Sequence, residues 1–129
     1  MFDNLEIFRM AYGLASHASA RLSVIANNVA QADTPGYRSK DIPPFAETYQ
    51  SQSQSTQMRA TRPGHLAAAA AGASEIRLID AGDENSPNGN SVSLETEMMK
   101  ASEVRYQHEL ALSIYSTSLN ILRTSVGRR

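Results

Sequence analysis

The sequence contains no cysteine and no tryptophan among its 129 residues. Without cysteine, the chain has neither a disulfide framework nor thiolate ligands for a structural metal ion. Its aromatic residues are five Tyr and three Phe, and its larger aliphatic side chains gather toward the two ends of the sequence. A chain of this length allows one domain, and this composition predicts that its private hydrophobic core is small.

Charge and hydropathy restrict the partners. The 12 Lys and Arg residues balance 13 Asp and Glu residues, so no net field attracts nucleic acid or anionic lipid. No apolar run reaches the roughly 18 residues that suggest a membrane span, and we expect no direct lipid anchor. Residues 1–6 lack the basic and apolar regions of a cleavable signal peptide. Any export is therefore expected to leave the chain intact.

Residues that could perform catalysis are scattered. His17, His65 and His108 lie far apart and form no metal-type spacing. Glu95 and Glu97 lie at a predicted helix start, where the helix dipole favours acidic side chains, and this explains them better than general acid–base chemistry. The sequence has no phosphate-binding glycine loop and no nucleophile motif. We predict no enzymatic activity, no cofactor and no metal site.

The periodicity of residues 5–32 predicts a long helix, with Asp3 or Asn4 as its N-cap. At 1.5 Å per residue it would be roughly 40 Å long, which is more than a small isolated domain needs. One face carries the apolar and small residues Ile7, Phe8, Ala11, Leu14, Ala15, Ala18, Leu22, Ile25, Ala26 and Val29.

The helix is predicted to stop before Pro35, which lacks a backbone N–H and disfavours helical geometry at Thr34. Pro35 and Gly36 form a favoured centre for a type II turn, because Gly36 accepts a positive φ. The following residues are polar and rich in loop signals, with a short helical turn expected at 45–49 and a weak strand at 75–79. We expect this insert to be partly disordered.

A second helical pattern runs from Ser93 to Val126, with Gly127 as its stop and Ser93 with Thr96 or Glu97 as a capping box. This helix carries two apolar stripes more than about 90° apart. The first stripe consists of Leu94, Ala101, Val104, Ala111, Leu112, Tyr115, Leu119, Leu122 and Val126, and the second stripe of Val92, Met99, Tyr106, Leu110, Ile114 and Ile121.

These patterns predict a mainly α fold in which the two terminal helices pair as a coiled-coil-like hairpin. Residues 1–34 and 92–129 would form a discontinuous helical domain, and residues 35–91 a loop-rich insert. A two-helix hairpin covers one stripe of each helix, so the second stripe would stay exposed and mark an interface. The alternative is a three- or four-helix monomer in which the insert covers the second stripe.

The predicted inter-subunit packing residues lie on both helices. They are Leu14, Leu22, Ile25 and Val29 on the N-terminal helix, and Tyr106, Leu110, Leu112, Ile114, Tyr115, Leu119 and Leu122 on the C-terminal helix.

Three segments carry a family resemblance, in matching order and spacing. They are residues 26–41, with Asn27, Ala30, Asp33, Thr34, Pro35, Gly36 and Tyr37; residues 61–66; and residues 88–95, with Gly89 and Asn90. The chain resembles the flagellar rod and hook axial proteins, and its short length and Asp33–Tyr37 segment are similar to the proximal rod subunits. Three departures are visible: Gln31 replaces the usual Asn, Asn88 replaces a common Asp, and the run before Tyr106 is shorter.

The resemblance implies a structural protein whose paired helices stack with neighbours into a hollow rod. That rod crosses the periplasm and transmits torque from the motor to the hook. Its implied partners are other flagellar rod proteins, the rod–ring adaptor protein of the FliE type, the membrane–supramembrane ring and the flagellar type III export apparatus, in a homo- and hetero-oligomeric helical assembly. The alternative reading is a soluble helical adaptor or export chaperone that binds one partner helix.

Overall fold

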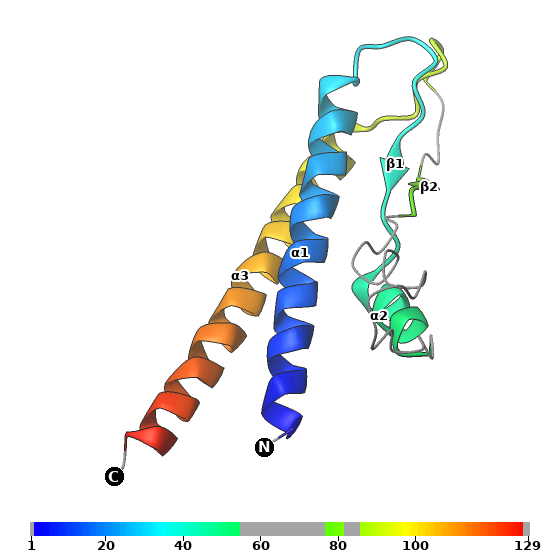
Figure 1. Ribbon diagram of the computed structural model, residues 1–129. Helices are drawn as coiled ribbons and strands as arrows, with labels where there is room; N and C mark the ends of the chain where they lie inside the picture. The colour runs from blue at the N-terminus through cyan, green and yellow to red at the C-terminus, as the bar shows by residue number, and fades with distance from the viewer. Residues whose placement is uncertain (1, 55–76, 82–85, 128–129) are drawn as a thin grey trace, which may run out of the picture.

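Two long helices and a short side layer make up the described part of the chain. The computed structural model describes residues 2–54, 77–81 and 86–127. Helix α1 (Phe2–Ala30) and helix α3 (Leu94–Val126) run antiparallel, so both chain ends lie at the same end of the molecule (Figure 1). The prediction of long N- and C-terminal helices in a mainly α fold is confirmed.

The helix ends differ slightly from those predicted. Helix α1 begins at Phe2, so Asp3 and Asn4 lie inside its first turn and the N-cap prediction was wrong. Helix α3 follows Ser93 as expected, but the Ser93 side chain makes no capping hydrogen bond. The capping-box prediction was therefore wrong as well, because Glu97 turns toward α1 instead. Gly127 ends α3 and donates its N–H to Arg123 O at 2.8 Å.

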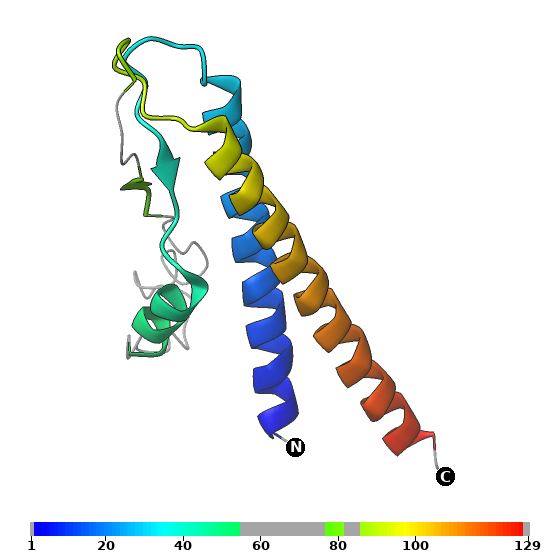
Figure 2. The same ribbon diagram turned by 180° about the vertical axis from the view of Figure 1, so that it is seen from behind.

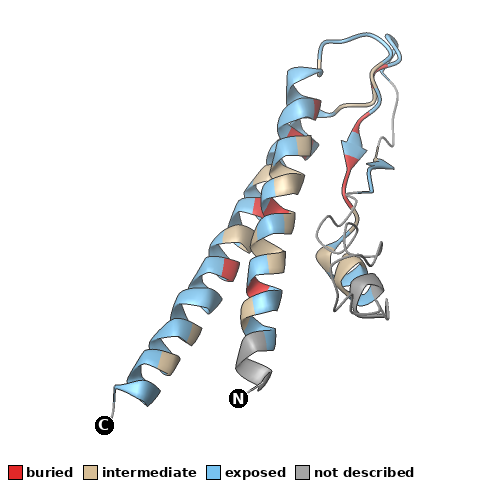
Figure 3. Cartoon of the chain, viewed as in Figure 1, coloured by how far each residue is buried: buried red, intermediate tan, exposed pale blue. Residues whose placement is uncertain are grey.

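The two helices pack along a seam with a seven-residue repeat (Figure 3). This repeat averages 3.5 residues per turn, which is the spacing of a left-handed coiled coil. The buried cluster holds Ala18, Ile25 and Val104, with Leu22 and Ala101 packed against it. The private hydrophobic core is therefore small, as the composition predicted. The buried positions are Ala11, Ala18, Ile25 and Asn28 on α1, and Glu97, Val104 and Ala111 on α3.

Helices α1 and α3 lie close near the hairpin turn and diverge toward the chain ends, as both ribbon views show (Figures 1 and 2). Toward the chain ends, Phe8 and Tyr115 make an edge-to-face ring contact with centroids 5.1 Å apart. Beyond this contact, Leu119 stays 42% exposed and Val126 78% exposed. Apolar residues of the first stripe are thus left uncovered at this end.

The side layer lies along one flank of the hairpin (Figures 1 and 2). Strands β1 (Lys40–Asp41) and β2 (Ile79–Asp80) pair antiparallel, with Lys40 opposite Asp80 and Asp41 opposite Ile79. Helix α2 (Phe45–Gln54) extends the short turn predicted at 45–49, and β2 lies at the end of the strand predicted at 75–79. Residues 55–76 and 82–85, on which most of the predicted disorder falls, lie outside the described residues.

Helix α2 packs on α1, not on the second stripe of α3. The Phe45 ring lies against Gly13 and makes an edge contact with His17 at 5.7 Å between ring centroids. Within the described ranges, the insert leaves the second stripe exposed. No helix of the described part combines the length and hydropathy needed to cross a membrane.

Candidate assembly site

The side chain of Asn28 joins three parts of the fold. It is fully buried, and its Nδ2 group donates to Lys40 O at 2.7 Å and to Glu97 Oε2 at 2.9 Å. Its Oδ1 atom accepts from Lys40 N–H at 3.1 Å and from the Tyr37 hydroxyl at 3.2 Å. Both amide hydrogens and both acceptor positions are used. Asn28 therefore connects α1 to β1 and to α3 without an unpaired buried group.

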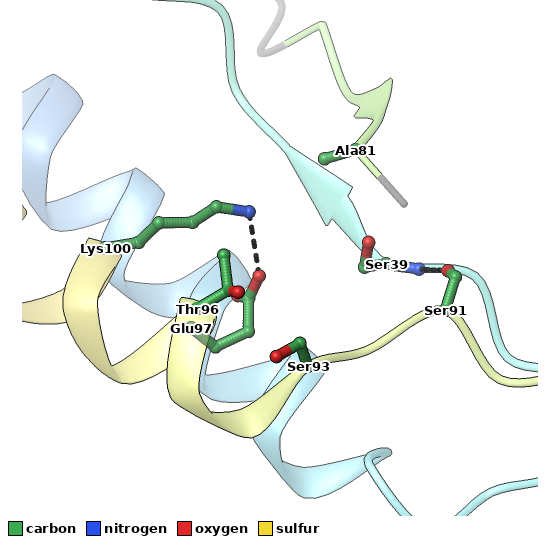
Figure 4. A pocket seen from close by; sticks show the side chains of 7 residues that line it. All are labelled: Ser39, Ala81, Ser91, Ser93, Thr96, Glu97 and Lys100. Carbon is green, nitrogen blue, oxygen red and sulfur yellow. Dashed lines mark hydrogen bonds and ion pairs between the residues drawn. The ribbon is translucent and has the colours of Figure 1, made fainter. Parts of the chain in front are cut away.

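Glu97 brings a charge into the seam. The residue is 2% exposed, and its Oε1 atom accepts from Lys100 Nζ at 2.9 Å (Figure 4). Lys100 Nζ also lies 4.0 Å from Asp41 Oδ2 on β1. A buried carboxylate with only one cationic partner would be costly if that partner were removed. Lys100 and Asn28 together make the position of Glu97 in the seam tolerable.

Asp41 and Arg21 form the second ion pair of the same network. Arg21 Nε and Arg21 Nη2 donate to the two carboxylate oxygens at 2.8 and 2.7 Å, a bidentate arrangement. Burial is the largest influence on Asp41 and alone would raise its pKa. Hydrogen bonds from Arg21 and the Ile42 N–H, with the charges of Arg21 and Lys100, outweigh burial and hold the pKa of Asp41 below its ordinary value of 3.8. The hydrogen bond to Asp41 in turn raises the pKa of Arg21, against the effect of burial.

We call Arg21, Asn28, Asp41, Glu97 and Lys100 the polar clasp. Its residues come from α1, β1 and α3, so it fixes the register of the three elements relative to one another. Apolar packing around so small a core specifies register weakly, whereas a polar network is satisfied in one arrangement only.

A second set of contacts holds the two chain segments at the hairpin end. Asn90 is 2% exposed, and its Nδ2 group donates to the carbonyls of Gln31, Ala32 and Thr34 at 3.0, 2.7 and 2.9 Å. These carbonyls belong to the turn that follows α1, and those of Gln31 and Thr34 also accept from the backbone N–H groups of Thr34 and Tyr37. Asn90 Oδ1 accepts from Val92 N–H at 2.8 Å just before α3. Asn90 thus links the end of one helix to the start of the other.

Two glycines allow the segments to meet. Gly36 has φ of 74° and Gly89 has φ of 78°, which favours glycine over residues with a Cβ. Tyr37 N–H donates to Thr34 O at 3.3 Å, so the predicted turn around Pro35 and Gly36 is present. Gly36 N–H donates to Asn88 O at 3.1 Å, and a Cβ on Gly89 would lie 3.5 Å from Gly36 Cα.

A shallow groove of about 230 Å³ lies beside the clasp (Figure 4). Its polar groups are already engaged in part, since Ser91 Oγ accepts from Ser39 N–H at 2.9 Å and Glu97 is paired with Lys100. Among the described residues, no group of three or more His, Cys, Asp or Glu side chains is placed to hold a metal ion. The lining residues are Ser39, Ala81, Ser91, Ser93, Thr96, Glu97 and Lys100.

His17 makes a packing contact. Its Nε2 atom lies 2.8 Å from Pro43 O, which assigns the proton to Nε2. The buried Nδ1 atom has no hydrogen-bond partner. His17 thereby attaches the start of the side layer to α1.

The second stripe is exposed along α3, with Glu103 among its apolar residues, whereas Val92, just before the helix, is half-buried. Met99 is 70% exposed, Tyr106 66%, Leu110 43%, Ile114 39% and Ile121 61%. Exposed apolar side chains in this number along one helix face are typical of an interaction surface.

The residues predicted to pack between subunits fall into three groups. Ile25 is 2% exposed, so its side chain is occupied within the chain and offers nothing to a neighbour. Leu14, Leu22 and Leu122 are half-buried. Exposed members are Val29, Tyr106, Leu110, Leu112, Ile114, Tyr115 and Leu119.

The predicted signature residues are split as well. Asn90 is buried and Tyr37 half-buried, and both take part in the contacts described above. The remaining members are exposed: Asn27, Ala30, Asp33, Thr34, Pro35, Gly36 and Gly89.

The sequence prediction missed the polar clasp. Asn28 lies three residues after Ile25, and Glu97 lies seven residues before Val104. Both therefore continue the buried face of their helix. A polar residue at an apolar position of the repeat was the available signal, but Glu97 had been assigned to the helix start. The clasp and the Asn90 contacts also cross the proposed boundaries at residues 34/35 and 91/92.

Comparison with known proteins gives a consistent family assignment. A family model described as "Flagella basal body rod protein" matches residues 10–38, which span most of α1 and the turn after it. The chain is 33% identical to the flagellar basal body rod protein FlgB of Agrobacterium fabrum over 132 aligned positions, covering 96% of this chain and 95% of the relative. It is 28% identical to FlgB proteins from two strains of Cereibacter sphaeroides, covering 88% of this chain and 92% of each relative. The chain therefore belongs to the FlgB family of flagellar basal body rod proteins.

Proposed function

We propose that this chain is a proximal rod subunit that polymerises with other rod proteins into the periplasmic drive shaft. That shaft transmits torque from the motor to the hook and is needed for motility. The observation that carries the proposal is the exposed second stripe, together with family membership over nearly the whole chain.

The balance between core and surface supports an assembled state. The buried apolar cluster consists of one Ile, one Val and one Ala, whereas the second stripe exposes five large apolar side chains. Burying these five side chains against neighbouring subunits would add hydrophobic free energy to the small amount that the chain's own core supplies. A heterologous contact that does not close on a dimer would produce the helical tube.

We further propose the partners and the location that the family suggests. The location is the rod of the flagellar basal body, in the periplasm. The partners are the other rod proteins, the rod–ring adaptor protein of the FliE type, the membrane–supramembrane ring and the flagellar export apparatus. Export would proceed without cleavage, and the structural role would require neither catalysis nor a cofactor.

The test is complementation of a strain that lacks this chain. Leu119→Asp and Leu122→Asp place a charge on the uncovered part of the first stripe and should abolish swimming and remove the chain from isolated basal bodies. Asn120→Asp is the matched control, because it adds the same charge at an exposed polar position between them, and it should swim. Normal swimming of both Leu variants would refute the assignment of this surface.

Sedimentation separates the rod reading from the adaptor reading. Purified chain mixed with other rod proteins should form large, open assemblies with rising helicity by circular dichroism. A closed one-to-one complex with a single partner, or a monomer indifferent to rod proteins, would instead support an adaptor or export chaperone.

A further inference from the structure

The second stripe is large enough to require a partner. Side chains of this size carry on the order of 200 Å² each, so exposed fractions of 39–70% leave roughly 500 Å² of apolar surface on five residues. A stable interface buries about 800 Å² per partner. The stripe and its borders therefore supply most of one side of such an interface, over the length of α3 from Met99 to Ile121.

A second exposed face on the same chain lacks charge. Between Arg9 and Asp33, the only Lys, Arg, Asp or Glu residue is Arg21, and Arg21 is held by Asp41 on the flank under the side layer. An exposed helix face in water normally carries charged residues. We call the following exposed residues the uncharged face of α1: Ser16, Ser19, Ser23, Ala26, Asn27 and Ala30.

The two faces point to opposite sides of the hairpin. At about 100° per residue, the uncharged face lies roughly 130° from the buried face of α1, and the second stripe lies roughly 120° from the buried face of α3 in the opposite sense. Because the helices are antiparallel, these rotations carry the faces to opposite sides. The same construction places Arg21 and Lys100 on one common flank, where Asp41 lies 2.7 Å from Arg21 and 4.0 Å from Lys100.

We propose that the second stripe of α3 in one copy packs against the uncharged face of α1 in a second copy of this chain. In this contact each α3 packs on its own α1 along the seam and on the α1 of a neighbouring copy along the second stripe. The flank that carries the side layer stays free. The uncharged face presents no charge that a helix of the second copy would have to desolvate. The second stripe presents one, Glu103, between Met99 and Tyr106, and the hydroxyl groups of Ser19 and Ser23 on the opposing face can donate to its carboxylate.

Both faces have similar length and overlap in height. Ser16 to Ala30 and Met99 to Ile114 each span roughly 20 Å at 1.5 Å per residue. Within one chain the Asn28–Glu97 and Phe8–Tyr115 contacts set the heights of α1 and α3 relative to each other. Ser19 therefore lies level with Tyr106 when neighbouring copies point in the same direction. The contact joins two different surfaces, so it repeats without closing on a dimer. The inference rests on the proposed function and names the surfaces by which lateral neighbours meet.

The absence of cysteine makes a disulfide test direct. A Ser19→Cys/Tyr106→Cys double variant would be oxidised in isolated basal bodies from a complementing strain and examined by denaturing electrophoresis. Within one copy the two positions are on opposite sides of the hairpin, so a disulfide between them must join two copies. A ladder of dimers and larger products is expected.

The control is Ser19→Cys/Arg105→Cys, since Arg105 is also exposed and adjacent to Tyr106 but on a different face of α3. It should give at least tenfold less multimer. Equal ladders from both variants, or no ladder from Ser19→Cys/Tyr106→Cys in a swimming strain, would overturn the pairing while leaving the rod function intact. Absence of the wild-type chain from basal bodies would instead refute the rod function. If Ser19→Cys/Tyr106→Cys does not swim, Ser16→Cys/Leu110→Cys tests the same contact one turn away.

Discussion

The strongest stability prediction concerns Asn28 in the polar clasp. Asn28→Ala removes hydrogen bonds to Lys40, Tyr37 and Glu97. It leaves the backbone groups of Lys40 and one oxygen of Glu97 unpaired in a site closed by three elements. Each unpaired buried polar group costs about 1–3 kcal/mol, and water entering the site recovers part of this. We expect the free energy of unfolding to fall by about 3–5 kcal/mol, a large part of the 5–15 kcal/mol typical of a domain.

The assay is urea unfolding followed by circular dichroism at a helix wavelength. Asn27→Ala is the matched control, because Asn27 is the adjacent exposed residue of the same helix, and its effect should stay within about 0.5 kcal/mol. Tyr37→Phe removes only the hydroxyl bond to Asn28 at 3.2 Å and should cost about 1 kcal/mol. Equal unfolding free energies for Asn28→Ala and Asn27→Ala would refute the view that the clasp stabilises the hairpin.

Three further predictions follow from the same contacts. The pKa of Asp41 is held below 3.8 in the folded chain. Its pairing with Arg21 therefore stabilises the fold above pH 3.8, and this stabilisation is lost as the pH falls through the lowered pKa. The difference in unfolding free energy between wild type and Asp41→Asn should shrink from pH 6 to pH 3, and a constant difference would contradict this. Gly36→Ala should cost about 1–2 kcal/mol because φ is 74°, whereas Gly13→Ala, inside α1, should cost less or stabilise; unfolding midpoints in urea would show the order. Asn90→Asp places a carboxylate against three carbonyls in place of an amide donor, so amide exchange in the last turn of α1 should accelerate at least tenfold relative to Asn88→Asp, and equal exchange rates would count against the link.

The helices themselves were predictable because periodicity is a local property. Apolar and small residues recur at helical spacing on α1 and α3, and Pro35 and Gly127 lie just beyond the ends of the predicted patterns. The positive φ at Gly36 followed from the Pro–Gly pair. The two stripes of α3 also followed from sequence, and with them the expectation of a surface that a single hairpin leaves uncovered.

The details that failed depended on choices between local and distant partners. Ser93 and Glu97 have the spacing of a capping box, but Glu97 binds Asn28, which is 69 residues away in sequence. Ile25 has the character of an interface residue, but it is placed where α1 meets Val104. The neighbours of Glu97 and Ile25 in the sequence do not predict these contacts, because each contact depends on which face of the other long helix packs against the residue.

The sequence by itself therefore determined the lengths of the two long helices, the turn after α1 and the presence of more apolar surface than one chain covers. The physical reason is that helix periodicity, Pro and Gly act on neighbouring residues. Only the tertiary structure decided the register of α1 against α3, the burial of Asn28 and Glu97, and the direction in which the second stripe points. These depend on hydrogen bonds and ion pairs between segments far apart in the chain, which are satisfied in one spatial arrangement and carry no signal in either segment alone.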